Sequence, residues 1–511
     1  MDHRAALGVV LAMLVPVPCR PGEAPEKTVV VIGAHAGDAG RIGGATLEAY
    51  RSRGYRGVYA VLAGSPAPAR PTEPLEAIQQ ERESARVAAA RLGAEAVLFD
   101  LHDIWIWQGR SRAYTGSPSW SRFRPPGSVD ITTATRRSQT QAEVARFLAG
   151  LNPELVITHC IGEDDLARHS TADLVFRAWQ QARRGGARLG QLWFRDAAAE
   201  SGMLGEPAFR RLLEPLRRGE FYVVADGGEP PPPVPEPRPA PPPAYRPRPG
   251  RQPVIMAIGA HADDVEYYAG GVFAKLIREG WKGIYVCATN NTAGCQLDTY
   301  SPSRPGGYLN IQKTSGPFPV DALETIQVRK EEARRAAAVL GAEPVFLDLH
   351  ETFCWIGRRQ VYMDHPWWGF YDAPGNGMVT AAAAGPGLAL TTELIKKHEP
   401  DLVLTHILGD GNPEHGQTGD LAYRAFRRAL AGGARLGQLW MSLRNPPQYL
   451  APAPARPDIT VDVAVYAPLN RRALAEHVSQ NGGDAKYCPR EGQCYEYYLL
   501  IVDATKAPGR P

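Results

Sequence analysis

Two groups of imidazole and carboxylate side chains follow apolar stretches in the second half of this chain. The first group lies in the segment AHADDVE, directly after the apolar residues 253–258, and the second begins at the end of residues 402–406. Their members are His261, Asp263, Asp264 and Glu266 in the first group, and His406, Asp410, Asn412, Glu414 and His415 in the second. A borderline divalent ion such as zinc accepts these side chains as ligands.

The chemistry of such a site is hydrolysis. A catalytic zinc ion takes three protein ligands and a water whose pKa it lowers to about 7, and a further carboxylate can take the proton of that water. Each group alone has an ordinary explanation: the HADD segment can cap a helix, and His415 can be a surface-loop residue. Together, and in this order, the two groups are more specific for a metal site.

The segments around these groups alternate between strand and helix. The apolar runs predict strands at residues 253–258, 281–288, 344–349 and 402–406, and the intervening stretches predict helices at 269–279, 322–340, 391–398 and 419–430. This alternation predicts an α/β fold with a mostly parallel sheet covered by helices on both faces. Ligand sites in such folds lie at the carboxyl ends of the strands, which is where both polar groups fall.

The first half of the chain repeats the second. GGARLGQLW occurs at 185–193 and 432–440, VIGAHAGD at 31–38 answers AIGAHADD at 257–264, and PELVITH at 153–159 answers PDLVLTH at 400–406. The second copy is longer, mostly within residues 290–319. Ordered matches of this kind indicate a tandem duplication of one domain rather than a short solenoid repeat.

A proline-rich segment separates the copies. Twelve of the 46 prolines fall within residues 229–250, a composition that favours extended polyproline II and excludes a packed core. We interpret it as an interdomain linker, with a ligand for an SH3-type domain as the alternative. The predicted domains are therefore residues 25–228 and 251–511.

The motifs of the second copy resemble those of the PIG-L/LmbE-like zinc-dependent deacetylases. AHADDVE, Gly270–Gly271, TNN at 289–291, RKEEA at 329–333 and NPEH at 412–415 are similar to the AHPDDE, TNG, RxxEA and HPDH motifs of that family. The resemblance covers most of residues 253–480, including EHVSQ at 476–480. It implies two tandem Rossmann-like domains, the first of them a degenerate copy.

The resemblance also implies roles for individual residues. His261, Asp264 and His415 would bind Zn²⁺, with another divalent metal such as Fe²⁺ as the alternative. Asp263 would be the general base, and Arg329 would contact the substrate. The implied reaction is removal of an N-acyl group, often N-acetyl, from an amino sugar or glycoconjugate, with metal-bound water as the nucleophile.

Two residues depart from the family pattern. Ala262 replaces a proline, and Asn412 replaces a histidine that stabilises the oxyanion or acts as an acid in relatives. An amide donates a hydrogen bond but cannot deliver a proton, so the leaving amine needs another acid, for which the candidates are His406, His350 and His365. Asn412 therefore keeps a second hypothesis open, a non-catalytic glycan-binding protein on the same fold.

The first copy lacks several of the implied active-site residues. His35 and Asp38 match the first two ligands, but Gly37 stands where the base stands in the second copy. Arg168 aligns with His415, although a shift of one residue would bring His169 into place. Glu81 aligns with Arg329, with Arg82 next to it. We expect a catalytically inactive copy that serves as a scaffold, a dimer-like partner or a glycan-binding domain.

The N-terminus resembles a secretory signal peptide. Residues 1–24 combine His3 and Arg4 with an apolar run from 5 to 15, which predicts export. The alternatives are a lipoprotein anchored through Cys19 and an apolar start of a cytoplasmic protein. In the cytoplasmic case the chain would be an intracellular amidase acting on a thiol conjugate. No later segment has 18 consecutive apolar residues, so we predict no spanning helix and no stable membrane insertion after signal removal.

Charge and cysteines add weaker constraints. The chain has 57 basic and 54 acidic residues, a net charge of +3, which predicts no nucleic-acid partner. The family resemblance implies a small-molecule or glycan substrate. Oligomeric state stays open. Cys488 and Cys494 flank a short loop and would form a disulfide in an exported protein, with two free thiols as the alternative.

Overall fold

The computed structural model of the chain describes two compact units. One comprises residues 1–197 and 216–229, and the other comprises residues 198–215 and 230–511. The structure describes residues 27–64, 74–103, 105–108, 111–114, 129–135, 137–163, 165–196, 203–225, 248, 250–292, 299–300, 308–309, 320–351, 353–356, 359–362, 386–444, 457–481 and 495–506. The predicted signal peptide, almost all of the predicted linker, Cys19, His365, Cys488 and Cys494 lie outside these residues.

The first unit is built on an eight-stranded sheet with the order β6-β3-β2-β1-β7-β8-β10-β9. Its strands from β6 to β8 run parallel, and β10 and β9 are antiparallel additions at one edge. The strands are β1 (Thr28–Gly33), β2 (Arg56–Gly64), β3 (Glu95–His102), β6 (Val129–Asp130), β7 (Leu155–Thr158), β8 (Gln191–Arg195), β9 (Arg217–Arg218) and β10 (Phe221–Ala225). A separate hairpin pairs β4 (Trp105–Gln108) with β5 (Ser111–Tyr114).

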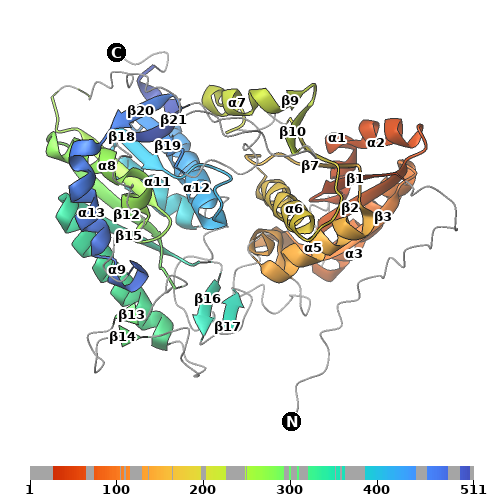
Figure 1. Cartoon of the computed structure of the whole chain (residues 1–511), viewed down its shortest axis with the longest axis horizontal. Coiled ribbons are helices and arrows are strands. Elements are labelled where there is room, and N and C mark those ends of the chain that lie inside the picture. The colour runs from red at the N-terminus through yellow and green to blue at the C-terminus, as the bar shows by residue number, and fades with distance from the viewer. Residues whose placement is uncertain are drawn as a thin grey trace, which may run out of the picture. The chain divides into compact units, whose positions relative to one another are not determined.

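Helices connect the parallel strands of this unit (Figure 1). They are α1 (Ala39–Ile42), α2 (Gly44–Arg51), α3 (Pro74–Arg91), α4 (Ile131–Ala134), α5 (Ser138–Leu151) and α6 (Leu166–Arg184). Helix α3 packs on β2 and β3, whereas α5 and α6 pack against each other. A 3-10 turn at Ala36–Asp38 follows β1 and carries the first motif.

The second unit has a seven-stranded sheet with the order β15-β12-β11-β18-β19-β21-β20. The strands from β15 to β19 are parallel, β21 pairs antiparallel with β19, and β20 pairs antiparallel with β21. The strands are β11 (Val254–Gly259), β12 (Lys282–Thr289), β15 (Ala342–Leu349), β18 (Leu402–Thr405), β19 (Gln438–Ser442), β20 (Ile459–Asp462) and β21 (Tyr495–Asp503). Two small hairpins join β13 (Thr299–Tyr300) to β14 (Tyr308–Leu309) and β16 (Phe353–Ile356) to β17 (Arg359–Tyr362).

The helices of this unit pack in two groups. Helix α13 packs against both α8 and α9, and α11 packs against α12 (Figure 1). The helices are α8 (Asp264–Arg278), α9 (Val320–Leu340), α11 (Pro386–His398), α12 (Pro413–Ala431), α13 (Ala467–Ala475) and α14 (Val478–Asn481). Helix α7 (Pro207–Leu213) also counts with this unit and lies against β21.

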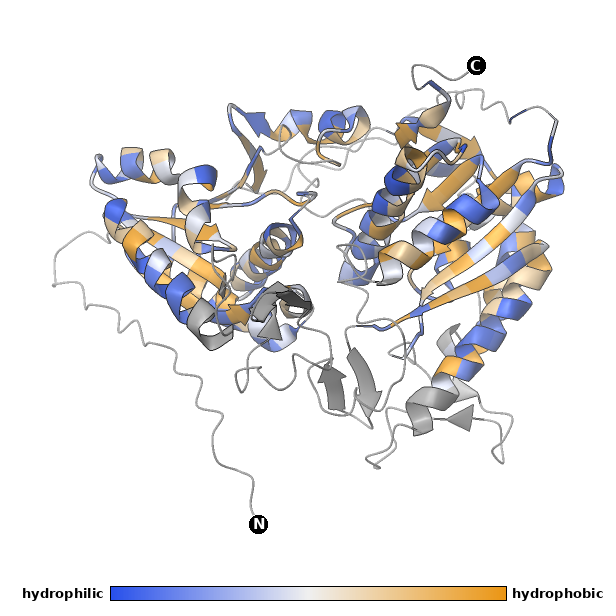
Figure 2. Ribbon diagram, turned by 180° about the vertical axis from the view of Figure 1, so that it is seen from behind, coloured by the Kyte–Doolittle hydropathy of each residue, from blue (hydrophilic) through white to orange (hydrophobic). Residues whose placement is uncertain are grey.

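Central strands form the core of each unit. Every residue of β1 and of β11 is buried, as expected for parallel strands covered on both faces. Figure 2 shows the apolar strands between helices whose outer sides are hydrophilic. Because the strands carry the hydrophobic contacts, the loops at their carboxyl ends are free to carry polar groups.

The two sheets confirm the predicted fold class of two mostly parallel α/β units. Strand β1 lies between β2 and β7, as β11 lies between β12 and β18, and Val29 pairs with Gly57 as Ile255 pairs with Gly283. No strand was predicted beyond residue 406, so the antiparallel edge of the second unit is an addition to the predicted fold. The predicted boundaries at 228 and 251 stay predictions, although residues 198–215 count with the second unit.

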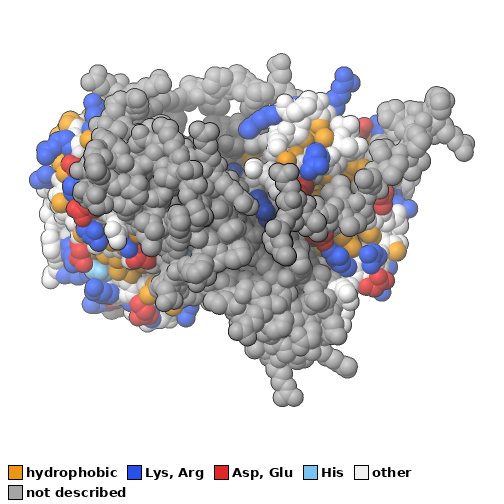
Figure 3. Space-filling view, turned by 90° about the horizontal axis from the view of Figure 1, so that it is seen from below, with side chains coloured by type: hydrophobic (Ala, Val, Ile, Leu, Met, Phe, Trp, Pro, Cys, Tyr) orange, Lys and Arg blue, Asp and Glu red, His pale blue; other side chains and the backbone are white. Residues whose placement is uncertain are grey.

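No helix among the described residues is long and apolar enough to cross a membrane. On the side of the molecule shown in Figure 3, basic and acidic side chains of the described residues are interspersed.

Candidate metal centre

A tight turn after β11 brings the first polar group together. His261 lies in the turn, Asp263 precedes α8, and Asp264 is the first residue of that helix. The backbone N–H of His261 donates to Asp264 Oδ2 at 2.7 Å. A Cβ on Gly259 would lie 2.8 Å from Asp264 Cβ, so glycine is required for the aspartate to fold back against the strand end.

The second polar group lies where β18 leads into α12. Asn412 is the N-cap of α12, and its Oδ1 accepts a hydrogen bond from the backbone N–H of Glu414 at 3.0 Å. With its oxygen held by the cap, Asn412 Nδ2 lies 3.2 Å from His415 Nε2. His415 follows in the first turn of the helix, and Pro413 occupies the position where a missing N–H is tolerated.

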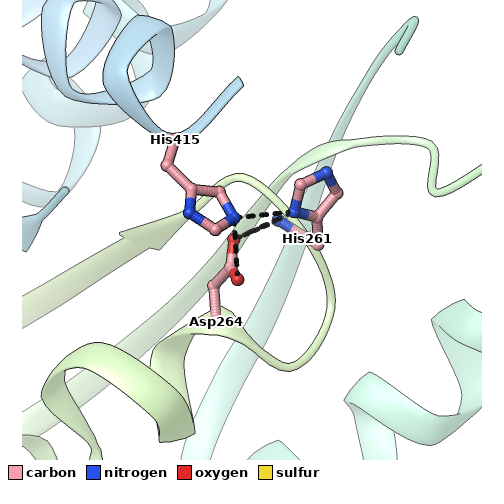
Figure 4. A group of neighbouring side chains, drawn as sticks. All are labelled: His261, Asp264 and His415. Atoms are coloured by element: carbon pink, nitrogen blue, oxygen red, sulfur yellow. Dashed lines mark hydrogen bonds and ion pairs between the residues drawn. The ribbon is translucent and has the colours of Figure 1, made fainter. Parts of the chain in front are cut away.

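The three predicted metal ligands converge (Figure 4). His261 Nδ1 lies 3.2 Å from His415 Nε2 and 3.3 Å from Asp264 Oδ2, and His415 Nε2 lies 3.4 Å from Asp264 Oδ1. A tetrahedral ion with bonds of about 2.0–2.1 Å spaces its ligands about 3.3–3.4 Å apart. The residues present therefore fit a divalent cation, and the donor set of two imidazoles and one carboxylate suits zinc or a similar metal.

The outer ring nitrogens of both histidines face buried carboxylates. His261 Nε2 lies 2.9 Å from Glu414 Oε2 and 3.1 Å from Glu351 Oε1. His415 Nδ1 lies 3.2 Å from Asp410 Oδ1. Protons on these outer nitrogens direct the lone pairs of the inner nitrogens toward the metal position, the usual arrangement behind metal-binding histidines.

Electrostatic shifts follow from this packing. Burial opposes the charged form of His261, but Asp264 foremost, together with Glu351 and Glu414, raises the pKa of His261 well above its usual range. Burial likewise opposes ionisation of Asp264, but His415 foremost holds the pKa of that carboxyl well below its usual range. The pocket thus holds an ionised carboxylate that attracts positive charge.

Asp263 and Arg329 form an ion pair beside the three ligands. Arg329 Nη2 lies 2.9 Å from Asp263 Oδ1, and Nη1 lies 3.2 Å from Glu332 Oε2. Although burial opposes it, Arg329 lowers the pKa of Asp263, so the predicted base is a carboxylate at neutral pH. The Arg329 side chain is 1% exposed, whereas that of Asp263 is 28% exposed. Contact of Arg329 with substrate stays a prediction, because its guanidinium here lies against the base.

Two of the candidate acids are buried histidines. His406 Nε2 lies 3.1 Å from Asp264 Oδ2, and burial lowers the pKa of His406. His350 Nδ1 lies 3.4 Å from Asn290 Nδ2, and burial lowers the pKa of His350 to about 4. Both are therefore neutral at pH 7 and poor proton donors, and the third candidate, His365, lies outside the described residues.

Two further residues contact the predicted ligands, Glu351 and Tyr268, and neither was predicted from the sequence. Glu351 follows β15 and reaches His261, and the Tyr268 hydroxyl lies 2.8 Å from His415 Nδ1. The strand-end rule that located the other groups applies equally to the end of β15 and would have found Glu351. Tyr268 carries no comparable signal, because an aromatic residue in an apolar helix pattern ordinarily indicates core.

Comparison with known proteins identifies a family for this part of the chain. Residues 256–426 match the family model PIG-L, described as GlcNAc-PI de-N-acetylase. The second half contains a PIG-L domain. All three predicted ligands, the predicted base and Arg329 fall within the matched residues.

Solved structures resemble about half of this chain. They include N,N'-diacetylchitobiose deacetylase from Pyrococcus horikoshii, at 18% identity and a TM-score of 0.31, covering 48% of this chain and 83% of that one. A deacetylase–teicoplanin complex has 15% identity and a TM-score of 0.33, with coverages of 49% and 99%. GalB, the 4-carboxy-2-hydroxymuconate hydratase from Pseudomonas putida, has 17% identity and a TM-score of 0.34, with coverages of 49% and 97%.

The first copy keeps the turn of the PIG-L domain but not its ligands. The backbone N–H of His35 donates to Asp38 Oδ2 at 2.8 Å, as in the second copy. His169 Nδ1 accepts from the Gly162 N–H at 2.9 Å, whereas Arg168 Nε lies 3.1 Å from Asp38 Oδ1. Arg168 is therefore the counterpart of His415. The sets of three metal-binding side chains found among the described residues all lie in the second unit.

Proposed function

We propose that the PIG-L domain is a metal-dependent hydrolase that removes an N-acyl group, with N-acetyl as the leading case, from an amino sugar or glycoconjugate. The observation that carries the proposal is the placement of the carboxylate Asp263 next to three predicted ligands whose facing atoms lie 3.2–3.4 Å apart. The family match to GlcNAc-PI de-N-acetylase supports the reaction type and the class of substrate.

His261, Asp264 and His415 would hold the metal. A bound divalent ion supplies polarisation of the amide carbonyl and acidification of a water molecule. We propose Zn²⁺ as this ion, with Fe²⁺ as the alternative, since the donor set accommodates either.

Asp263 would move the proton. As an ionised carboxylate it would accept a proton from the attacking water, and Arg329 Nη2 donates to one of its oxygens and holds it in place. Because His350 and His406 are buried and neutral at pH 7, we assign the second transfer to Asp263 as well. Its Oδ–H then protonates the leaving nitrogen, which balances water and amide against a carboxylic acid and an amine.

Asn412 would stabilise the oxyanion. Its cap bond to Glu414 fixes the amide so that Nδ2 lies at the metal pocket, 3.2 Å from His415 Nε2. A donor fixed in this way stabilises the negative charge that develops on the acyl oxygen without needing to reorient. Asn412 would thus donate the hydrogen bond that the histidine of the family pattern donates, but it cannot transfer a proton as that histidine can.

The alternative function is glycan binding without turnover, favoured by Asn412 in place of a titratable histidine.

The proposal of export rests on residues 1–24, which lie outside the described residues.

Metal content and acetate release from N-acetylglucosamine derivatives test the proposal together. The full chain should bind a divalent ion and release acetate, chelation should abolish release, and His415→Ala should lose both metal and activity. Sugar binding without release at any added divalent metal would favour the alternative. Full acetate release after chelation would rule out the metal-dependent mechanism.

A further inference from the structure

The first copy places a guanidinium where the second copy places a metal ligand. Arg168 Nε lies 3.1 Å from Asp38 Oδ1, and in the second copy His415 Nε2 lies 3.4 Å from the equivalent oxygen of Asp264. The two side chains start from corresponding positions in the first turn of α6 and of α12. The arginine side chain, however, is itself a cation, whereas the imidazole offers a lone pair to a metal cation.

The remaining donors of the site are retained around Asp38. His159 Nε2 lies 3.0 Å from Asp38 Oδ2, as His406 Nε2 lies 3.1 Å from Asp264 Oδ2. His35 Nε2 lies 3.1 Å from Asp103 Oδ2. This contact corresponds to that between His261 and Glu351 in the second copy, so the histidines and the carboxylate next to His35 are retained while Arg168 replaces the third ligand position.

We propose that Arg168 takes the place of the divalent cation in the first copy, so that this copy is a metal-free form of the same site, filled by the chain's own guanidinium. The wild-type chain then carries one metal ion, held in the second copy. The first copy retains a latent cation site that a single substitution would open.

The charges of the site agree with an internal cation. The Asp38 side chain is 2% exposed and would be costly to bury as an unpaired anion. Burial opposes its ionisation, but its cationic neighbours, His159 foremost, hold the pKa of Asp38 below its usual range. Asp165, the N-cap of α6, accepts from the Arg168 backbone N–H at 3.1 Å and so fixes where the arginine leaves the helix.

Arginine also explains why the first copy excludes a metal. A guanidinium stays protonated at all ordinary pH values and has no lone pair to offer a cation. Its positive charge within 3.1 Å of Asp38 repels a second cation from the only carboxylate that the turn supplies. Substituting histidine would restore the set His–Asp–His of the second copy.

Metal stoichiometry of the full chain tests this inference. We expect about one zinc per chain for wild type and about two for Arg168→His, and one for Arg168→His in a His415→Ala background. Arg177→His is the matched control, because Arg177 lies on the same helix and pairs with Asp173 at 2.9 Å away from the site. This control should keep the wild-type stoichiometry.

A folded Arg168→His protein with no additional ion, or a wild-type chain with two ions, would overturn the inference. If wild type bound no metal and Arg168→His bound one ion, the result would contradict the proposed function of the second copy. It would still identify Arg168 as the cation that excludes metal from the first copy. If Arg168→His does not fold, thermal unfolding decides. Arg168→Met should lower the Tm, and adding Asp38→Asn should recover part of the loss, whereas no recovery would refute an internal cation.

Discussion

The two copies share one scaffold and differ, among other positions around it, at three that bear on the proposed chemistry. Each has a parallel sheet, a turn in which an aspartate accepts from the backbone N–H of a histidine, and a buried histidine beside that aspartate. The differences are Gly37 for Asp263, Glu81 for Arg329 and Arg168 for His415. Fold and site geometry can therefore persist while the side chains proposed to bind metal and move protons are replaced.

Two of the replacements belong together. In the second copy, Arg329 pairs with Asp263 at 2.9 Å. In the first copy there is no base to pair with, and Glu81 Oε1 instead accepts from the backbone N–H of Ala36 at 2.6 Å. Loss of the proposed base and of its arginine at the same site favours the hypothesis that the two act as a unit, in which the arginine would position the base.

The largest expected effect comes from removing the base. Asp263→Asn should lower kcat by roughly 10²–10⁴ while the bound metal remains, since Asp263 is not one of the three ligands. Acetate release and metal content check this. Gly37→Asp is the matched substitution that introduces the base into the first copy. A Cβ at this position has nothing within 4 Å, so it meets no clash. This variant should still give no activity in the first copy, because Arg168 fills the site. Turnover that survives Asp263→Asn at the wild-type rate would contradict the assignment of the base.

A smaller effect is expected when the partner of the base is changed. Arg329→Lys should lower kcat by about tenfold with little change in KM, because one charged hydrogen bond of about 1.5 kcal/mol corresponds to about tenfold in rate. Steady-state kinetics separate this role from substrate contact, the role implied by the family resemblance. A rise in KM with kcat unchanged would assign Arg329 to the substrate instead. Arg335→Lys is the control, since Arg335 lies on the same helix and pairs with Glu476.

The smallest effect concerns the pH dependence of the first copy. Burial lowers the pKa of His35, but Asp103 foremost, with Asp38 and Asp165, raises it to about 9. Because the fold favours protonated His35, this side chain stabilises the fold fully at pH values below its unfolded pKa of about 6.5. The stabilisation is lost as the pH rises through about 9. His35→Gln should therefore lower the Tm by about 2–4 °C at pH 6 and by less at pH 10. Calorimetry across this range checks the trend, and a Tm difference that grows with pH would contradict it.

Much of the fold was predictable from sequence. The apolar strands and the repeat predicted two mostly parallel units, because buried parallel strands have a distinct composition. The helix starts were less predictable: α8 begins at Asp264 and α12 at Pro413, before the apolar periodicity at 269 and 419. Polar motif residues in a first turn hide the helix from a hydrophobicity pattern. The pairing of residues 198–215 with the second unit depends on long-range packing that no local pattern encodes.

The candidate site was predictable in part for a similar reason. The motif residues His261, Asp264 and His415 meet as expected, since strand ends at one edge of a parallel sheet are close in space. The ion pair of Arg329 with Asp263 could not be read from sequence, because it joins residues 66 positions apart. Nor could the choice between Arg168 and His169, which the register of α6 decides.

The central claim is that the metal-dependent chemistry lies in the second copy alone. The most direct test compares acetate release by two matched variants of the full chain, Asp264→Asn and Asp38→Asn, which change equivalent carboxylates. We predict that Asp264→Asn abolishes metal-dependent release, whereas Asp38→Asn keeps the kcat/KM of the wild type. Loss of release in Asp38→Asn that remains folded, or wild-type release by Asp264→Asn, would contradict the account.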